Sequence, residues 1–505
     1  MKKVFTRRQF MAAAGVAVAA GALTACGGSS ASTAGSAAGS AAASGSTIKV
    51  GVMGPLTGDA SVYGQAVVNG ASLYIKQVNA DGGVNGKQLE VIAMDEQGDE
   101  TQAVTCFTKM VDQGITALVG DVTTAPTLAV AAESADYNMP MVTASATAEA
   151  VTYDAETDTV NGNVFRACFT DPFQGVKMAD YAYEKLGYKK AAVIFLKGKD
   201  YNEGLAENFA KEFEAKGGTI VDQESYSEGD VDFKTQLTSI LGKNPEVVFC
   251  PNYYQEVGQI LAQAESVGLT VPFLGGDGWD GLEGYATADQ LKDSYFCACY
   301  AKGSSAAFED AYKAEYGEAY PNGFAPLGYD AAMTVVYGIQ AAEDAGLEAG
   351  TDEYKQAVID ALIDDSFQTL REKLLRVTTE DPLQRLYDAG VVYRGHAKAS
   401  PGIYALLWRW HAGEASEACL AAMTELVRYG QAAGKIRRDD PHLIAWSIWS
   451  AVHGFVQFET RPEHDTPVDD DDAAYSFLLR LLIRGVRTPQ TVSEGTATIA
   501  DTSRS

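Results

Sequence analysis

Short apolar runs alternate with longer amphipathic segments over residues 47–366. The apolar runs are "TIKVGVMGPL", "LEVIAMDE", "ITALVG", "MPMVTAS", "KAAVIFL", "PEVVFC" and "VPFLGG". Segments between them, such as "AENFAKEFEAKGG", carry apolar residues three and four positions apart, as on one face of a helix. This alternation predicts parallel sheets with helices on both faces. Since about 320 residues is more than one such sheet usually holds, we expect two α/β lobes.

After residue 366 the pattern becomes helical throughout. The stretches "EDPLQRLYDAGVVYRGHAKASPGIYALLWRW" and "GEASEACLAAMTELVRYGQAAG" have apolar residues at helical spacing. Asp440 and Pro441 are a favourable N-cap and first residue for a further helix. That helix is apolar on two faces, which predicts burial in a core or at a dimer contact. A last helical pattern, "DAAYSFLLRLLIRGV", is followed by a polar tail at 488–505.

The use of basic residues changes at the same place. Before Phe367 the chain has twenty Lys and three Arg, and from Phe367 onward it has three Lys and thirteen Arg. All five His also follow this point. Because Lys and Arg are nearly equivalent on a solvated surface, one folded domain rarely sorts them so cleanly. The break indicates two sequences of different origin joined near residue 368.

Charge and motif content exclude several functions. Residues 1–366 carry 49 acidic against 23 basic side chains, a balance that repels nucleic acid. The chain has no Walker A, HExxH or GxSxG motif and no zinc-type Cys/His spacing, so we expect no enzyme activity, cofactor or metal. "FCACY" is expected to place Cys297 and Cys299 on one face of a strand, as buried apolar residues or as a redox or metal pair.

The N-terminus has the pattern of an export signal. Residues 1–26 have a basic start and an apolar run too short to span a bilayer. "TRRQFM" resembles a twin-arginine signal, and "LTAC" resembles the bacterial lipoprotein box, which predicts lipidation at Cys26. Residues 27–46 contain only Gly, Ser, Ala and Thr, the composition of a flexible linker. We therefore expect a protein lipid-anchored to the outer face of the bacterial cytoplasmic membrane.

Turns after the predicted strands are the candidate binding positions, because ligands of open α/β sheets bind outside the carboxyl ends of the strands. Thr123 and Thr124 precede a helix, where a hydroxyl could cap the helix or its N-terminus could bind a carboxylate. Ser145 and Thr147 follow the next strand, in either an ordinary turn or a ligand contact.

A third turn, "FLGGDGWDG", carries Asp277 between glycines and Trp279 beside it. It is either a surface turn or a site where a carboxylate and an aromatic wall hold a primary ammonium. Taken together, the three turns suggest a site for a zwitterion, with helix N-termini for a carboxylate and an acid for an ammonium.

Three longer stretches carry a family resemblance. "IKVGVMGPLTGDASVYGQAVVNGASLYIKQVNADGGVNGKQLEV", "YNEGLAENFAKEF" and "YYQEVGQILAQAESVGL" resemble the leucine/isoleucine/valine-binding protein family, the type I periplasmic binding proteins of branched-chain amino-acid ABC importers. The resemblance covers 47–366. It implies one lobe of about 47–165 and 301–366 and a second of about 166–300, which close on an amino acid in the cleft.

The resemblance also implies site residues on the first lobe. Tyr63 of "SVYG" would line the pocket, and Thr124 would meet the α-carboxylate of the ligand. Ser145 and Thr147 of "TASAT" would offer backbone and hydroxyl groups to both ends of the ligand.

Further site residues are implied around the ligand side chain and its ammonium. Tyr201, Tyr253 and Phe324 would form the wall of the side-chain pocket. Asp277 stands where the best-known members have glutamate and would pair with the α-ammonium, with Trp279 filling space nearby. Because aspartate is one methylene shorter, the resemblance does not fix which amino acid fits.

The helical part has a resemblance of its own. "AWSIWSAVHGFVQF", with "GKIRRDDP" before it, resembles the C-terminal ligand-binding and dimerisation domain of TetR-like repressors of the Trp-His-Gly type. It covers about 370–487, in a helical domain of 367–487, and implies a homodimer. His453 is either a structural histidine or a ligand contact. No helix-turn-helix precedes "LREKLLRV", and the last strands of the receptor family are missing after "DDSFQ".

Two functions remain open. The first is a solute receptor that delivers an amino acid to the membrane permease of an ABC importer. The second is a ligand-responsive or dimerisation module without transport activity, whose C-terminal part derives from a repressor that lacks its DNA-binding domain.

Overall fold

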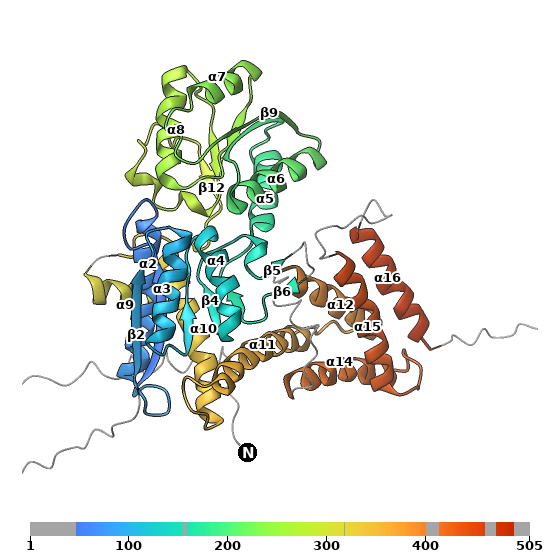
Figure 1. Ribbon diagram of the computed structural model, residues 1–505. Helices are drawn as coiled ribbons and strands as arrows, with labels where there is room; N and C mark the ends of the chain where they lie inside the picture. Colours follow the sequence, from blue (N-terminus) through green and yellow to red (C-terminus); the bar gives the residue numbers. More distant parts are fainter. Residues whose placement is uncertain (1–46, 155–158, 318, 400–413, 460–470, 489–505) are drawn as a thin grey trace, which may run out of the picture. The chain divides into compact units, whose positions relative to one another are not determined.

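The computed structural model describes residues 47–154, 159–317, 319–399, 414–459 and 471–488 (Figure 1). The chain divides into two compact units between Ile363 and Asp364. The predicted signal and linker at 1–46, which include Cys26, lie outside the described residues, as does the tail from 489 onward. None of the described helices is long and apolar enough to cross a membrane.

The first unit contains two parallel sheets of five strands each. The first sheet has the order β2-β1-β3-β4-β7. Its strands are β1 Ile48–Gly54, β2 Leu89–Asp95, β3 Ala117–Val119, β4 Met141–Thr143 and β7 Val164–Arg166. The second sheet has the order β12-β11-β10-β8-β9. Its strands are β8 Lys190–Leu196, β9 Thr219–Tyr226, β10 Val247–Phe249, β11 Phe273–Gly275 and β12 Tyr295–Phe296. The predicted two-lobed α/β fold is confirmed.

Helices alternate with these strands along the chain. In the first lobe they are α2 Ser61–Ala80, α3 Glu100–Asp112, α4 Thr124–Ser134, α9 Ala306–Tyr316 and α10 Phe324–Asp344. In the second lobe they are α5 Asp171–Asp180, α6 Asp200–Ala215, α7 Lys234–Lys243 and α8 Tyr254–Val267. Shorter segments are β5 Tyr153–Asp154 and β6 Thr159–Val160, which form an antiparallel pair, and the 3₁₀ turn η4 Asp277–Trp279.

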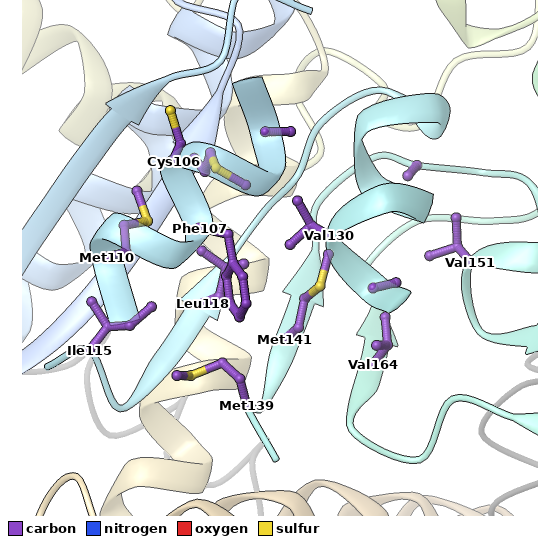
Figure 2. Close-up of a cluster of buried hydrophobic side chains, with 14 of the residues drawn as sticks. Cys106, Phe107, Met110, Ile115, Leu118, Val130, Met139, Met141, Val151 and Val164 are labelled. Atoms are coloured by element: carbon purple, nitrogen blue, oxygen red, sulfur yellow. The ribbon is translucent and has the colours of Figure 1, made fainter. Parts of the chain in front are cut away.

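One face of the first sheet is covered by α3 and α4. Figure 2 shows the buried cluster between them and the strands, with Phe107, Val130 and Met141 among its members. The cluster contains no residue of α2 or α10, which pack against each other and also contact the strands. The two helix pairs therefore cover different faces of the sheet, as the alternating pattern predicted.

Glycines allow α2 and α10 to approach closely. A Cβ atom built at Gly70 would lie 1.9 Å from the carbonyl oxygen of Ala325. At Gly328, on the other helix, it would lie 2.2 Å from the carbonyl oxygen of Val67. The backbones of the two helices therefore pack directly on each other, and this contact fixes the start of α10 against α2.

The second lobe has an aromatic core. Phe209 of α6 stacks on Phe249 of β10 with ring centroids 4.1 Å apart, and on Phe213 with centroids 5.6 Å apart. All three rings are fully buried. Cys297 packs at the edge of this core, but β12 ends at Phe296, so Cys297 and Cys299 follow the strand rather than lying within it. The prediction of a longer strand here was wrong.

The described part of the second unit is helical, as predicted. Its helices are the C-terminal part of α11 Asp352–Leu375, α12 Pro382–Ala399, α14 Glu414–Ala432, α15 Pro441–Glu459 and α16 Asp471–Val486. The predicted N-cap is confirmed, since Asp440 Oδ1 accepts hydrogen bonds from the backbone N–H of His442 at 2.8 Å and of Leu443 at 3.2 Å. His453 Nδ1 lies 2.6 Å from the Tyr393 hydroxyl.

Candidate ligand-binding site

A cavity lies in the first unit, between the turns that follow the strands of its two lobes. It is lined by Tyr63, Val122, Thr123, Thr124, Ser145, Thr147, Tyr201, Tyr253, Asp277, Gly278 and Phe324. Eight of the nine residues predicted from the sequence are therefore among its lining residues. The first lobe contributes α2, the turns after β3 and β4, and the start of α10. The second lobe contributes α6, the residue before α8, and η4.

The N-terminus of α4 forms one side of the cavity. Thr123 is the N-cap residue, but its side chain makes no capping hydrogen bond, so the hydroxyl cap considered from the sequence is not formed. Two hydroxyl groups fix the turn between β3 and α4. Ser145 Oγ donates to the carbonyl of Val122 at 2.7 Å, and Thr143 Oγ1 donates to the carbonyl of Asp121 at 2.6 Å. A helix N-terminus in such a fixed position favours an anion.

Asp277 contributes an acidic side chain to the cavity, in contrast to the positive end of the α4 dipole. Its Oδ1 accepts hydrogen bonds from Gln174 Nε2 and from the Tyr201 hydroxyl, each at 3.0 Å. The side chain is buried, and burial raises the pKa of Asp277 to about 6, while the hydrogen bonds from Gln174 and Tyr201 act in the opposite direction. A carboxylate that has lost this much water is stabilised strongly by a cation brought into the cavity.

Four aromatic rings also line the cavity. Tyr63 stacks on Phe324 with ring centroids 4.3 Å apart, and Tyr201 stacks on Tyr253 with centroids 4.8 Å apart. Tyr63 meets the edge of Tyr253 at 5.8 Å, which joins the two pairs. Burial raises the pKa of each of these tyrosines, so their hydroxyls stay protonated and can donate hydrogen bonds. The wall is therefore apolar with a few fixed donors, as in most small-molecule sites.

Hydrogen bonds connect the two lobes at the rim of the cavity. The Tyr63 hydroxyl, on α2, donates to the carbonyl of Gly278 at 2.5 Å. The Tyr254 hydroxyl, on α8, donates to the carbonyl of Asp59 at 2.5 Å, and Gln255 Nε2 donates to the same carbonyl at 3.0 Å. Groups from each lobe thus line one cavity and bond across it.

Trp279 differs from its predicted position. Its indole Nε1 donates to the carbonyl of Cys250 at 2.9 Å, and its ring occupies the space that a Cβ atom at Gly275 would need. The side chain is 2% exposed and fills the second lobe beneath the turn, not the cavity. Asp277 and Trp279 are two residues apart in the 3₁₀ segment η4, which has three residues per turn, so their side chains point to different sides of it.

Three further residues of the site have no signal in the sequence. Gly278 has no side chain and Val122 is an ordinary apolar residue, so the side-chain pattern gives no signal for either of these lining residues. Gln174 holds Asp277 from 103 residues away in the chain. It lies in an amphipathic stretch whose pattern indicates only a helix.

Comparison with known proteins follows the same division of the chain. The sequence profile of the periplasmic binding protein family matches residues 47–390. The chain belongs to this family. Members are solute-binding proteins, and the match extends beyond the change in composition at Phe367.

Relatives of this periplasmic binding protein include two with stated ligands. The chain is 31% identical over 319 residues to "Leu/Ile/Val-binding protein homolog 3" of Brucella melitensis, covering 63% of this chain and 83% of that protein. It is 31% identical over 327 residues to the leucine-, isoleucine-, valine-, threonine- and alanine-binding protein of Pseudomonas aeruginosa, covering 64% and 84%.

Solved structures show the same similarity. A branched-chain amino acid transporter substrate binding protein from Streptococcus pneumoniae, in complex with isoleucine, is 32% identical with a TM-score of 0.57, covering 63% of this chain and 88% of that one. A leucine binding protein from Thermotoga maritima is 29% identical with a TM-score of 0.56, covering 63% and 87%.

The helical part matches a second family. The profile of the tetracyclin repressor-like C-terminal domain matches residues 386–482. The chain therefore joins a periplasmic binding protein to a repressor-type C-terminal domain, which confirms the fusion inferred from composition and motifs.

Proposed function

We propose that this periplasmic binding protein captures a branched-chain or similar amino acid and delivers it to the membrane permease of an ABC importer. The observation that carries the proposal is that Asp277 and the N-terminus of α4 line the same cavity. A carboxylate for an ammonium and a helix N-terminus for a carboxylate are complementary to the two charges of an amino acid. The names of the relatives support the same ligand class.

Capture would proceed by closure of the two lobes. A ligand that contacts both lobes stabilises the closed state, because the open state offers it only half of these contacts. The bonds from Tyr63 to Gly278 and from Tyr254 to Asp59 would form only on closure and would add to this preference.

Isothermal titration with leucine, isoleucine, valine, threonine and alanine tests the proposal. At least one of them is expected to bind with a Kd of micromolar or tighter. A folded protein that releases no heat with any of these amino acids would contradict the assignment of the ligand class.

The location follows from the N-terminal residues and is also part of the proposal. Cys26 of "LTAC" would carry a lipid that holds the receptor at the outer face of the cytoplasmic membrane, with residues 27–46 as a linker. Replacing Cys26 with alanine is expected to move the exported protein from the membrane fraction to the soluble fraction. Retention of the Cys26→Ala variant in washed membranes would exclude the lipid anchor.

The alternative role of a dimerisation module is favoured by one surface feature. Phe477 and Leu481 lie one turn apart on α16 and are 64% and 53% exposed. We propose that they contribute to a homodimer through the C-terminal helices, since adjacent exposed apolar side chains of this size mark interaction sites. Light scattering is expected to give twice the chain mass for the wild type and the single-chain mass for Phe477→Asp. A monomeric wild type would contradict the dimer.

A further inference from the structure

The side-chain amide of Gln174 contacts both the backbone and the carboxylate of Asp277. Gln174 lies on α5 and is fully buried. Its Oε1 accepts a hydrogen bond from the backbone N–H of Asp277 at 2.9 Å, and its Nε2 donates to Asp277 Oδ1 at 3.0 Å. One side chain thus holds both the backbone and the carboxylate of the same residue.

A second buried acid lies on the other side of this amide. Gln174 Nε2 is 3.4 Å from Asp171 Oδ1, so its two hydrogens are directed at two carboxyl groups. Asp171 is 1% exposed, and its Oδ2 has no hydrogen-bond partner among the described residues. These contacts fix the orientation of the amide, because exchanging its oxygen and nitrogen would place an acceptor against two acids and a donor against an N–H group.

The remaining groups around Asp277 supply little positive charge. In addition to burial, Asp280 raises the pKa of Asp277, and the charge on Asp277 in turn raises the pKa of Asp171 and of the Cys168 and Cys299 thiols. Arg166 is the nearby cation, but its guanidinium donates to the carbonyls of Ala146 at 3.0 Å and Ala148 at 2.8 Å. Tyr201 gives Asp277 one further hydrogen bond, at 3.0 Å.

The two oxygens of the Asp277 carboxylate have different contacts. Oδ1 accepts hydrogen bonds from Gln174 and Tyr201, whereas Oδ2 has a long contact of 3.9 Å with the Cys299 thiol. We propose that Gln174 is a positioning residue for recognition: its amide directs Asp277 Oδ2 toward the ligand ammonium and keeps the carboxylate ionised beside Asp171. This role rests on the proposed amino-acid receptor function.

Two substitutions test the role. Gln174→Met preserves the side-chain volume but removes both hydrogen bonds, and we expect its Kd at pH 6.5 to rise about tenfold. Gln174→Glu preserves the shape but places a third carboxyl group between Asp171 and Asp277, and we expect a rise of about a hundredfold. Gln236→Glu, a part-buried glutamine of the same lobe with one bond of 3.3 Å to the carbonyl of Ser225, is the matched control and should bind as the wild type does.

The pH dependence of Kd separates positioning from general damage. Without the amide the carboxylate of Asp277 is harder to ionise, so the affinity lost by Gln174→Met should be partly recovered as the pH is raised from 6 to 8.5. A structural defect would weaken binding equally at every pH. Wild-type affinity and a wild-type pH profile in Gln174→Met, with binding lost in Asp277→Ala, would overturn the proposal.

A ligand-free measurement keeps this result distinct from failure of the receptor function. Carboxyl ¹³C NMR can follow the titration of Asp277 in the wild type and in Gln174→Met without any amino acid present. We expect the titration to move to higher pH in the variant. If no amino acid binds the wild type, the receptor function fails, while an unchanged titration in the variant would overturn the role of Gln174 itself.

Discussion

Replacing Asp277 with alanine is expected to raise the Kd for the bound amino acid at least about a hundredfold at neutral pH. The substitution removes the carboxylate that lines the cavity, and under the proposed function it would leave the ligand ammonium desolvated among the rings of Tyr63, Tyr201 and Tyr253. Truncating one partner of a buried charge pair is costly because the other charge stays unpaired. Titration calorimetry of Asp277→Ala beside the wild type measures the loss.

A matched control isolates the role of this one acid. Glu283 lies a few residues further along the chain and is exposed. Glu283→Ala changes the net charge of the protein as Asp277→Ala does, so it should leave the Kd within about twofold, because exposed charges contribute little. Equal affinities for Asp277→Ala and the wild type would show that the ligand ammonium is bound elsewhere.

The same acid gives binding a defined pH dependence. Burial raises the pKa of Asp277 to about 6 in the ligand-free protein, and only the ionised carboxylate attracts the ammonium. Affinity should therefore be full above pH 7 and fall as the pH drops through 6. In Asp277→Asn this dependence should disappear. The stability of the ligand-free protein should change with pH in the opposite direction from the affinity. Because folding raises the pKa of the Asp277 carboxyl, the folded state loses stability as the pH rises and this group ionises. Asp277→Asn should therefore unfold at a higher temperature than the wild type at pH 7.5.

Replacing Gly70 with alanine is expected to lower the free energy of unfolding of the first unit by about 3 kcal/mol. The added Cβ atom would lie 1.9 Å from the carbonyl oxygen of Ala325, and a backbone atom cannot move aside as a flexible side chain can. α2 and α10 would have to separate, which also disturbs the reciprocal contact of Gly328 with Val67. Urea unfolding followed by circular dichroism measures the change.

Gly242 supplies the control for this substitution. It lies in α7, and a Cβ atom there would meet no atom within 4 Å. Alanine is the better helix former by up to about 1 kcal/mol, so Gly242→Ala should be neutral or stabilising. If Gly70→Ala unfolds at the same urea concentration as the wild type, the close helix contact does not hold in solution.

The parts of the fold that follow from local pattern were predictable. Seven of the ten strands of the two sheets lie in the short apolar runs named from the sequence, whereas β7, β9 and β12 do not. Asp440 before Pro441 marks the start of α15 because capping depends on adjacent residues alone. The turns after β3, β4 and β11 could be singled out because parallel strands end at a common edge. These turns supplied Thr124, Ser145, Thr147 and Asp277. The four aromatic residues of the cavity were implied only by the family resemblance: Tyr63, Tyr201, Tyr253 and Phe324.

Features that depend on distant contacts were not predictable. Trp279 was expected at the cavity because it is adjacent to Asp277, but the carbonyl of Cys250 and the space above Gly275 direct it into the lobe. Gln174 has no local signal, since its partner lies 103 residues away. The strand expected at "FCACY" ends at Phe296, because apolar alternation alone does not fix where pairing stops.

Amino-acid binding by the chain from residue 27 to 505 is the most direct test of the proposed receptor. Calorimetric titration with leucine, isoleucine and valine should show one site per chain, a Kd of micromolar or tighter for at least one of them, and no binding by Asp277→Ala. Absence of heat with every amino acid, from a protein shown to be folded by circular dichroism, would mean that this cavity is not an amino-acid site.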